Sequence, residues 1–244
     1  MTHLMAMPVL ALALSAQPPA EAPPPDETCF HTVEEFNWWM DRYYLAPEPE
    51  KIVCSLRSGS SLYEDNPSAH SPLAHFYAAV LRGNRSLTTK VFDHASANEG
   101  ERFLALHALW VVHTAETAKL VSRAKEAWRS SAVDAFIERL ESKRPLDPLE
   151  RPLTEPESLD DLWATFAATG DERIVARIAS VAHLQEDGHG MEIIVGGTAR
   201  WSLQSMVDQH ARVRAAVEKL AASAEGVTKV ILEEMLVPPR SGDQ

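Results

Sequence analysis

The sequence predicts an all-α protein in which antiparallel helical hairpins stack as a short irregular α-solenoid or a bundle. Apolar residues recur at intervals of three and four through most of the chain, the periodicity of helices buried on one side. Gly83 and Gly170 each separate two such segments, as expected where one helix ends and the next turns back. Only Met191–Val195 has the apolar, β-branched run that is typical of a strand.

Residues 28–143 are expected to form an N-terminal helical lobe. Its helical segments are Thr32–Leu45, the short Lys51–Leu56, the segment opened by Ser71-Pro72 and ended by Gly83-Asn84, Leu87–His94, Asn98–Arg123 and Ser131–Ser142. Ser58–Pro67 is predicted to be a polar loop. Asn98–Arg123 is expected to be the longest helix, and its first half is apolar on nearly all sides, which predicts a central position.

A second helical lobe is expected over residues 158–237. It follows a linker at 144–157, where four prolines among charged residues prevent a long helix. The lobe opens with a hairpin in which Ser158 and Asp161 have the spacing of an N-terminal capping box, although Glu or Gln is the usual partner. Gly170 suits the left-handed position after the first helix, and Asp171 suits the cap of the second.

The rest of the second lobe is predicted to contain a further hairpin, a long connection and a terminal helix. The hairpin flanks the polar break Asp208-Gln209-His210, and Val227–Leu236 is the terminal helix. The connection spans Gln185–Gly197, where Met191–Val195 is expected to be a short extended segment or the lip of a pocket. Gly196-Gly197-Thr198, ahead of the next helix, could offer backbone N–H groups to an anion.

The helix–glycine–helix pattern of Leu73–His94 and Leu159–Leu220 resembles tetratricopeptide and other α-solenoid repeats. Trp163 and Trp201 lie 38 residues apart, within the range of about 34–47 residues that such helical pairs show. The Trp–Leu-Gly–Tyr pattern of tetratricopeptide repeats is incomplete, because Leu-Gly does not follow Trp163 at its usual place. The resemblance implies stacked helical pairs and a groove that binds a protein or peptide.

The N-terminus predicts export of the chain. Residues 1–16 are expected to be a signal peptide, since Leu4–Ala16 is apolar, too short to span a bilayer and ends in small residues, although no Lys or Arg precedes it. Residues 17–27 are expected to form a Pro-rich tether without fixed structure, and residues 238–244 are expected to form a disordered tail. The mature chain is expected in the periplasm or outside the cell, without membrane insertion. A cytoplasmic location is the alternative.

The cysteine content bears on the compartment of the protein, and the net charge bears on its class of partner. The two cysteines, Cys29 and Cys54, are expected to form a disulfide between the first two helices if the compartment is oxidising, and to remain free thiols in a reducing cytosol. The formal net charge of -12 argues against binding to nucleic acid or to anionic lipid, since both require clustered Lys and Arg.

Histidines on the predicted helix Asn98–Arg123 raise the alternative of a metal-dependent helical enzyme. His113 and Glu116 are three residues apart, and His107 lies two turns earlier. Di-metal sites in helical bundles repeat a Glu-x-x-His pattern, whereas this chain has the reverse order, once. The preferred interpretation is that both histidines are packed or half-buried neutral imidazoles. That interpretation predicts no metal, no cofactor and no catalytic residue.

Trp38, Asp187 and His189 are the candidate contacts for a partner. Trp38 directly precedes Trp39, and adjacent side chains on a helix point about 100° apart. One indole is therefore expected at the surface, where it could contact a partner, unless the buried face of the helix is wide. Asp187 and His189 are polar residues in a glycine-rich loop. Since no catalytic motif is recognised, the leading hypothesis is an exported, non-enzymatic protein that binds another protein or peptide in the cell envelope.

Overall fold

The computed structural model describes residues 29–95 and 99–237. Within these residues every regular element is a helix and none is a strand, which confirms the all-α prediction. The predicted signal peptide, the tether and the C-terminal tail lie outside the described residues. None of the described helices is both long and apolar enough to cross a bilayer.

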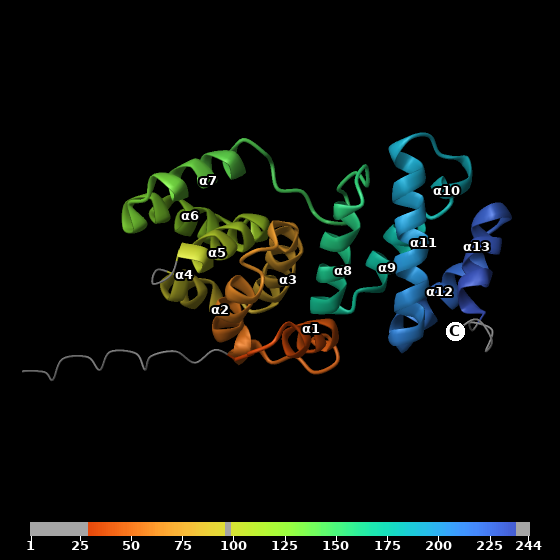
Figure 1. The fold of residues 1–244 in the computed structure, drawn as a ribbon, viewed down its shortest axis with the longest axis horizontal. Helices are drawn as coiled ribbons and strands as arrows, with labels where there is room; N and C mark the ends of the chain where they lie inside the picture. The colour runs from red at the N-terminus through yellow and green to blue at the C-terminus, as the bar shows by residue number, and fades with distance from the viewer. Residues whose placement is uncertain (1–28, 96–98, 238–244) are drawn as a thin grey trace, which may run out of the picture.

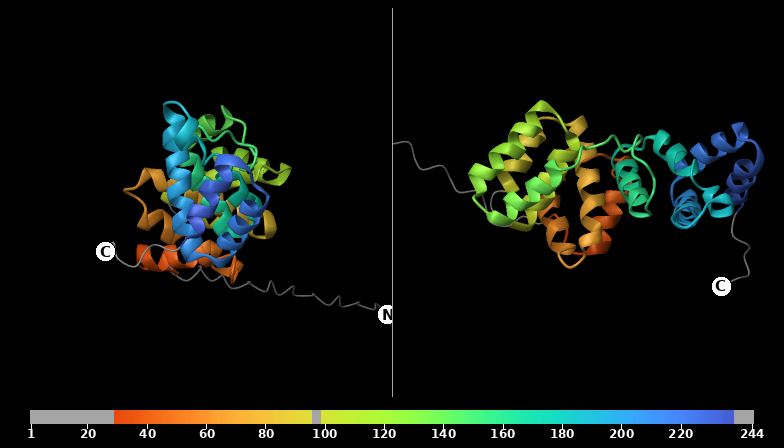
Figure 2. Two further views of the ribbon diagram at one scale, coloured as in Figure 1. Left: turned by 90° about the vertical axis from the view of Figure 1, so that its right-hand side faces the viewer. Right: turned by 90° about the horizontal axis from the view of Figure 1, so that it is seen from above.

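The helices follow one another along an elongated body (Figure 1). They are α1 (Val33–Arg42), α2 (Ile52–Leu62), α3 (His70–Gly83), α4 (Leu87–Ala95), α5 (Glu99–Val112), α6 (Ala115–Trp128), α7 (Ser131–Glu141), α8 (Glu157–Thr169), α9 (Glu172–Ala179), α10 (Leu184–Asp187), α11 (Met191–Gln209), α12 (Ala211–Ser223) and α13 (Gly226–Leu236). Seen from above (Figure 2, right), α4–α7 occupy one end and α11–α13 the other.

Two hydrophobic cores lie along this body, and α8 contributes to both. The first is formed by α1–α7 and includes the fully buried Phe36 and Tyr77. The second is formed mainly by α8, α9 and α11–α13 and includes Val175 and Leu203. On α8 the small residues Ala164, Ala167 and Ala168 face the first core, and the larger Leu159, Leu162 and Phe166 face the second. The small face allows α8 to pack closely on α3, its most extensive partner.

The start of the described chain is attached to α2. Cys29 and Cys54 lie at disulfide distance, with their Cα atoms 5.4 Å apart, as the sequence predicted for an oxidising compartment. α1 then begins after Thr32, whose hydroxyl accepts a hydrogen bond from the backbone N–H of Glu35.

The predicted loop at Ser58–Pro67 is wrong in its first half, because α2 continues to Leu62. Ser58, Gly59 and Ser60 are buried where α2 packs on α1 and α3. A Cβ at Gly59 would lie 3.2 Å from Phe36 Cζ and from the Tyr77 hydroxyl oxygen. The Tyr77 hydroxyl donates to Ser55 Oγ at 3.2 Å, and Ser55 in turn donates to a carbonyl oxygen one turn back. Serine and glycine here allow close packing of helices rather than marking a loop.

The single long helix predicted from Asn98 to Arg123 is also wrong, because α5 and α6 are separate. His113 has a left-handed backbone conformation with φ 52°, which ends α5 after Val112. Thr114 then caps α6 in a capping box with Thr117. A cap inside an almost continuous apolar periodicity therefore breaks the helix.

The start of α8 differs from the predicted capping box, whereas its end agrees with the prediction. α8 begins at Glu157 with Pro156 in the cap position, and both Ser158 and Asp161 are buried side chains within the helix. Gly170 is left-handed with φ 63°, and the Asp171 carboxylate accepts a hydrogen bond from Arg173 N–H at 3.0 Å.

The predicted connection Gln185–Gly197 is helical over most of its length. α10 covers its start, and Met191–Val195 forms the first turns of α11 rather than an extended segment. Gly196 lies inside α11, where its lack of a side chain allows the backbone of Gln185 to pack against it. The anion site considered at Gly196-Gly197-Thr198 is therefore wrong, since backbone N–H groups inside a helix donate to carbonyls one turn back.

Candidate binding cleft beneath the connection between α7 and α8

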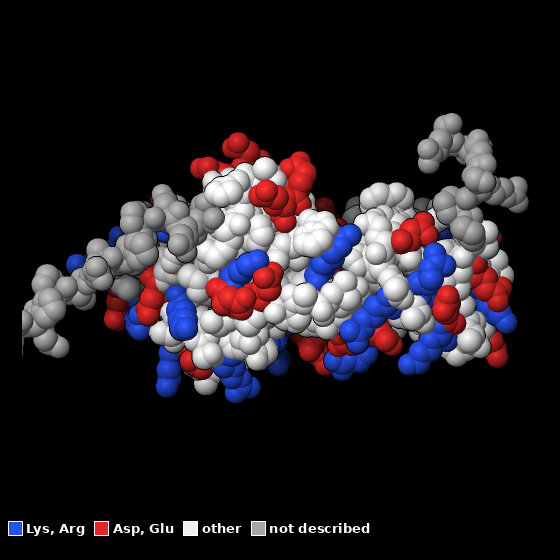
Figure 3. All heavy atoms as spheres, turned by 90° about the horizontal axis from the view of Figure 1, so that it is seen from below, with Lys and Arg blue, Asp and Glu red and all other residues white. Residues whose placement is uncertain are grey.

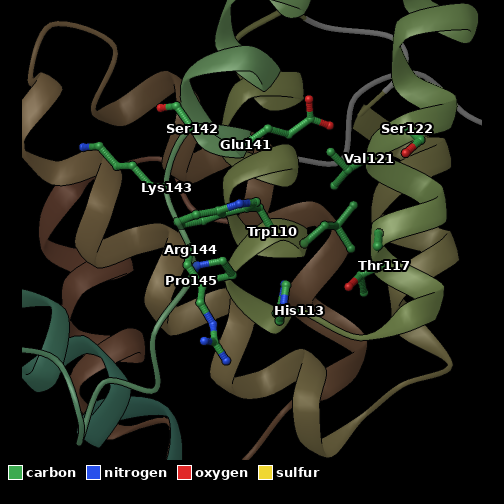
Figure 4. A pocket seen from close by; sticks show the side chains of 12 residues that line it. Trp110, His113, Thr117, Val121, Ser122, Glu141, Ser142, Lys143, Arg144 and Pro145 are labelled. Atoms are coloured by element: carbon green, nitrogen blue, oxygen red, sulfur yellow. The ribbon is translucent and has the colours of Figure 1, made fainter.

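The connection between α7 and α8, residues 142–156, runs from the upper end of α7 to α8 and passes above α3 in the view of Figure 1. Two cavities of about 510 and 400 Å³ adjoin beneath it, and both are lined by Trp110 and by Ser142–Pro145. In the smaller cavity the Trp110 indole lies between this segment and the α6 side chains Thr117 and Val121 (Figure 4). The two cavities are together called the connection cleft below.

The larger cavity of the connection cleft is strongly cationic. Four Lys or Arg residues line it, namely Arg139, Lys143, Arg144 and Arg151, and no Asp or Glu among the described residues does. Arg139 stacks over Phe136, with its guanidinium carbon 5.3 Å from the ring centroid. On much of the face in Figure 3, by contrast, Lys and Arg lie among Asp and Glu, apart from a group of acidic side chains at the top of the view. A cavity lined by one sign concentrates the field and attracts the opposite charge.

Asp161 anchors the connection from the side of α8. It is buried, and its carboxylate accepts a hydrogen bond from Arg151 at 2.5 Å. His75 Nδ1 on α3 lies 3.3 Å from the other carboxylate oxygen and 2.9 Å from the Ser71 carbonyl oxygen. Burial disfavours the Asp161 charge, but His75, the Ser71 hydroxyl and Arg151 outweigh it and hold the pKa of Asp161 below its usual value. The ionised carboxylate therefore ties α3, α8 and the connection together.

His107 on α5 forms part of the aromatic wall of the larger cavity. Its ring centroid lies 5.9 Å from that of Trp110 and 6.3 Å from that of Phe136. Burial, reinforced by the neighbouring His75, lowers the pKa of His107 to about 4. The imidazole is therefore neutral near pH 7 and contributes a polar aromatic surface rather than a charge.

The three residues of the alternative metal site are not brought together. His107 borders the larger cavity, whereas His113 borders the smaller one at the junction of α5 and α6. Glu116, in the first turn of α6, accepts a hydrogen bond from the Thr88 hydroxyl at 3.3 Å. Among residues 29–95 and 99–237, no group of three or more His, Cys, Asp or Glu side chains is arranged to hold a metal ion.

The predicted partner contacts are exposed but lie on separate surfaces. Trp38 is 63% exposed, with the Arg42 guanidinium 5.1 Å from its ring centroid. Asp187 ends α10, and the backbone N–H of His189 donates to the Glu192 carboxylate at 3.0 Å. Figure 1 places α1 far from the turn between α10 and α11. These residues therefore do not form one continuous surface.

Sequence reasoning did not find the connection cleft. Arg139 and Lys143 belong to the end of the predicted N-terminal lobe, and Arg144 and Arg151 to a segment interpreted only as a linker, although Lys143-Arg144 directly before a Pro-rich stretch was a visible signal. Comparison of the chain with protein-family models, with curated proteins and with solved structures finds no match in any of the three. The geometry of the molecule is therefore the basis for a functional proposal.

Proposed function

We propose that the protein is an exported, non-enzymatic binding protein that holds an acidic peptide segment of another protein in the connection cleft. The observation that carries this proposal is the larger cavity, which has four cationic side chains and no facing carboxylate in a chain of net charge -12. Guanidinium groups form paired, charge-assisted hydrogen bonds with carboxylates, and three of the four cations are arginines.

The walls of the cleft favour a peptide over a small inorganic anion. Trp110, Phe136 and Leu140 present apolar and aromatic surface next to the cations. Pockets that bind organic ligands combine a mainly apolar lining with a few polar groups that fix orientation. An acidic peptide with aromatic or aliphatic side chains would match both parts, whereas extended nucleic acid would be repelled by the overall negative charge.

Not all of the cleft cations are equally available. Arg151 is already paired with Asp161. By contrast, Arg139, Lys143 and Arg144 have no carboxylate within ion-pair distance in the described part of the chain. Lys143 and Arg144 are therefore the side chains expected to bind the acidic ligand, whereas Arg151 positions the connection.

Export is part of the same proposal. The proximity of Cys29 and Cys54 supports an oxidising compartment, since disulfides persist mainly in the periplasm and outside the cell. A bound peptide would then belong to another protein of the cell envelope or its surroundings.

Fluorescence anisotropy with a labelled peptide of alternating Glu and Phe residues tests the proposal, with the equivalent Lys and Phe peptide for comparison. We expect the acidic peptide to bind and the basic one not to bind. Lys143→Glu and Arg144→Glu should each weaken binding by roughly tenfold or more, because each removes a charge-assisted contact and adds a repulsive one. Lys90→Glu on α4 is the matched control, since Lys90 is exposed and does not line the cleft. Equal binding of both peptides, or equal loss in the control variant, would contradict the proposal.

A further inference from the structure

A second hollow, of about 340 Å³, lies where the two cores meet. Its walls come from α1, α3, α8 and α11, and Figure 1 shows α8 between α3 and α11 with α1 beneath. It shares no lining residue with the connection cleft. We call it the junction groove. Its charged side chains are acidic, whereas those of the larger cavity of the cleft are basic, and its aromatic side chains are two tryptophans.

The aromatic part of the junction groove is formed by Trp163 of α8 and Trp201 of α11. Trp201 is 73% exposed, the highest value among the large hydrophobic side chains that the structure describes. Trp163 is half-buried, and its indole N–H has no hydrogen-bond partner in the described part of the chain. The thioethers of Met40 and Met206 complete a soft, polarisable lining.

The charged part of the junction groove is acidic. Asp41 of α1 and Asp160 of α8 line it, and no Lys or Arg among the described residues does. Neither carboxylate has an ion pair or a side-chain hydrogen bond in the described part of the chain. Partial burial raises the pKa of Asp41, and partial burial of the carboxyl group together with the neighbouring Asp161 and Glu157 raises the pKa of Asp160. The charge of the neighbouring Arg42 lowers the pKa of Asp41, but it does not offset the effect of burial, and neither carboxylate is held in an ion pair within the described residues.

We propose that the junction groove is a binding site for an organic ammonium group, held between the faces of Trp163 and Trp201 and neutralised by Asp41 and Asp160. Indole faces attract cations through the negative potential of the ring, and desolvated sites strengthen this attraction. Trp is the strongest of the aromatic residues in this respect, and carboxylates at the rim add an attraction that does not require hydrogen-bond donors on the ligand.

Two other classes of occupant fit the groove less well. A metal ion would require several oxygen, nitrogen or thiolate ligands at one point, and the described residues contain no such group. A purely apolar surface docked here would bury both unpaired carboxylates without compensation, which is strongly unfavourable. An ammonium group satisfies the indoles and the carboxylates together.

The ammonium group has two sources with the same chemistry, a small quaternary ammonium compound and a lysine side chain of a peptide. Isothermal titration calorimetry with choline and with N-acetyl-lysine methylamide distinguishes them. The carbon isostere 3,3-dimethylbutan-1-ol has the shape of choline without its charge. We expect at least one of the two cations to bind and the neutral isostere to bind roughly tenfold more weakly or not at all.

Variants locate the site. Trp201→Ala and Asp160→Asn should each weaken binding of the cation by roughly three- to tenfold. Trp201 and Asp160 are exposed, so these changes leave the core intact. Trp38→Ala is the matched control, because Trp38 is also an exposed indole but lies outside the groove. Equal binding of the neutral isostere, no binding of either cation, or an unchanged affinity in Trp201→Ala would overturn the proposal, whatever the result at the connection cleft.

Discussion

Two neighbouring glycines of α11 provide a sharp test of how α10 packs against it. A Cβ at Gly196 would lie inside the van der Waals distance of Gln185 N and 2.7 Å from the Leu184 carbonyl carbon. Both are backbone atoms of α10, so a rotamer change cannot relieve the overlap. A Cβ at Gly197 would meet only the Gln185 Cδ atom, at 3.8 Å, which is ordinary contact.

Gly196→Ala and Gly197→Ala should therefore change stability in opposite directions. Both gain up to about 1 kcal/mol from the higher helix propensity of alanine. Gly197→Ala should keep this gain, whereas in Gly196→Ala an overpacking penalty of about 1–3 kcal/mol should exceed it. The expected difference between the two variants is then about 1–3 kcal/mol in the free energy of unfolding.

Urea denaturation followed by far-ultraviolet circular dichroism measures this difference. Each kilocalorie corresponds to a shift of about 2–4 °C in Tm for a chain of this size, so a thermal scan provides a second reading. Amide hydrogen exchange of α10 should also be faster in Gly196→Ala than in Gly197→Ala, because α10 has to move away from α11. If Gly196→Ala proves as stable as Gly197→Ala, the close packing of α10 on α11 is refuted.

Two further predictions concern His107 and the cysteine pair. Because burial lowers the pKa of His107 from 6.5 to about 4, the unfolded chain binds more protons between these pH values; stability should therefore fall as the pH falls from 6.5 to 4, by up to about 3 kcal/mol. Urea midpoints across this range should show a shallower dependence in His107→Phe than in the wild type, and identical slopes would rule out a buried neutral imidazole. The Cys29–Cys54 pair spans 25 residues, so its reduction or the Cys54→Ser substitution should lower the free energy of unfolding by about 3 kcal/mol. If the wild type has the same free energy of unfolding with and without a reducing agent, no bridge forms.

The helices that were predicted well depend on signals within one or two turns of the chain. Gly170 and Asp171 mark a helix end and a helix start by their own backbone and side-chain preferences, and the structure uses them in this way. The apolar stripe of α9 is similarly local, since Ile174, Val175 and Ile178 are all buried.

The incorrect predictions share a different cause. The second half of α2 resembled a loop because the close packing that requires Gly59 involves Phe36 and Tyr77, which come from other helices. The start of α11 resembled a strand because Met191–Val195 is an apolar, β-branched run. In the structure Met191, Ile193 and Ile194 are exposed on a helix, and the packing of α10 against Gly196 was not visible in the sequence. Local propensity is a weak guide wherever a neighbouring helix decides which small or apolar residue is buried.

The sequence by itself determined the all-α class and most helix boundaries, because helical periodicity and caps are properties of short segments. The structure then placed Cys29 and Cys54 at disulfide distance. Only the tertiary structure brought Arg139, Lys143 and Arg144 around one cavity, and placed Asp41 and Asp160 beside Trp163 and Trp201. The physical reason is range. A helix is stabilised by hydrogen bonds four residues apart, whereas the charge of a cleft is the sum over side chains from segments that meet only when the cores pack.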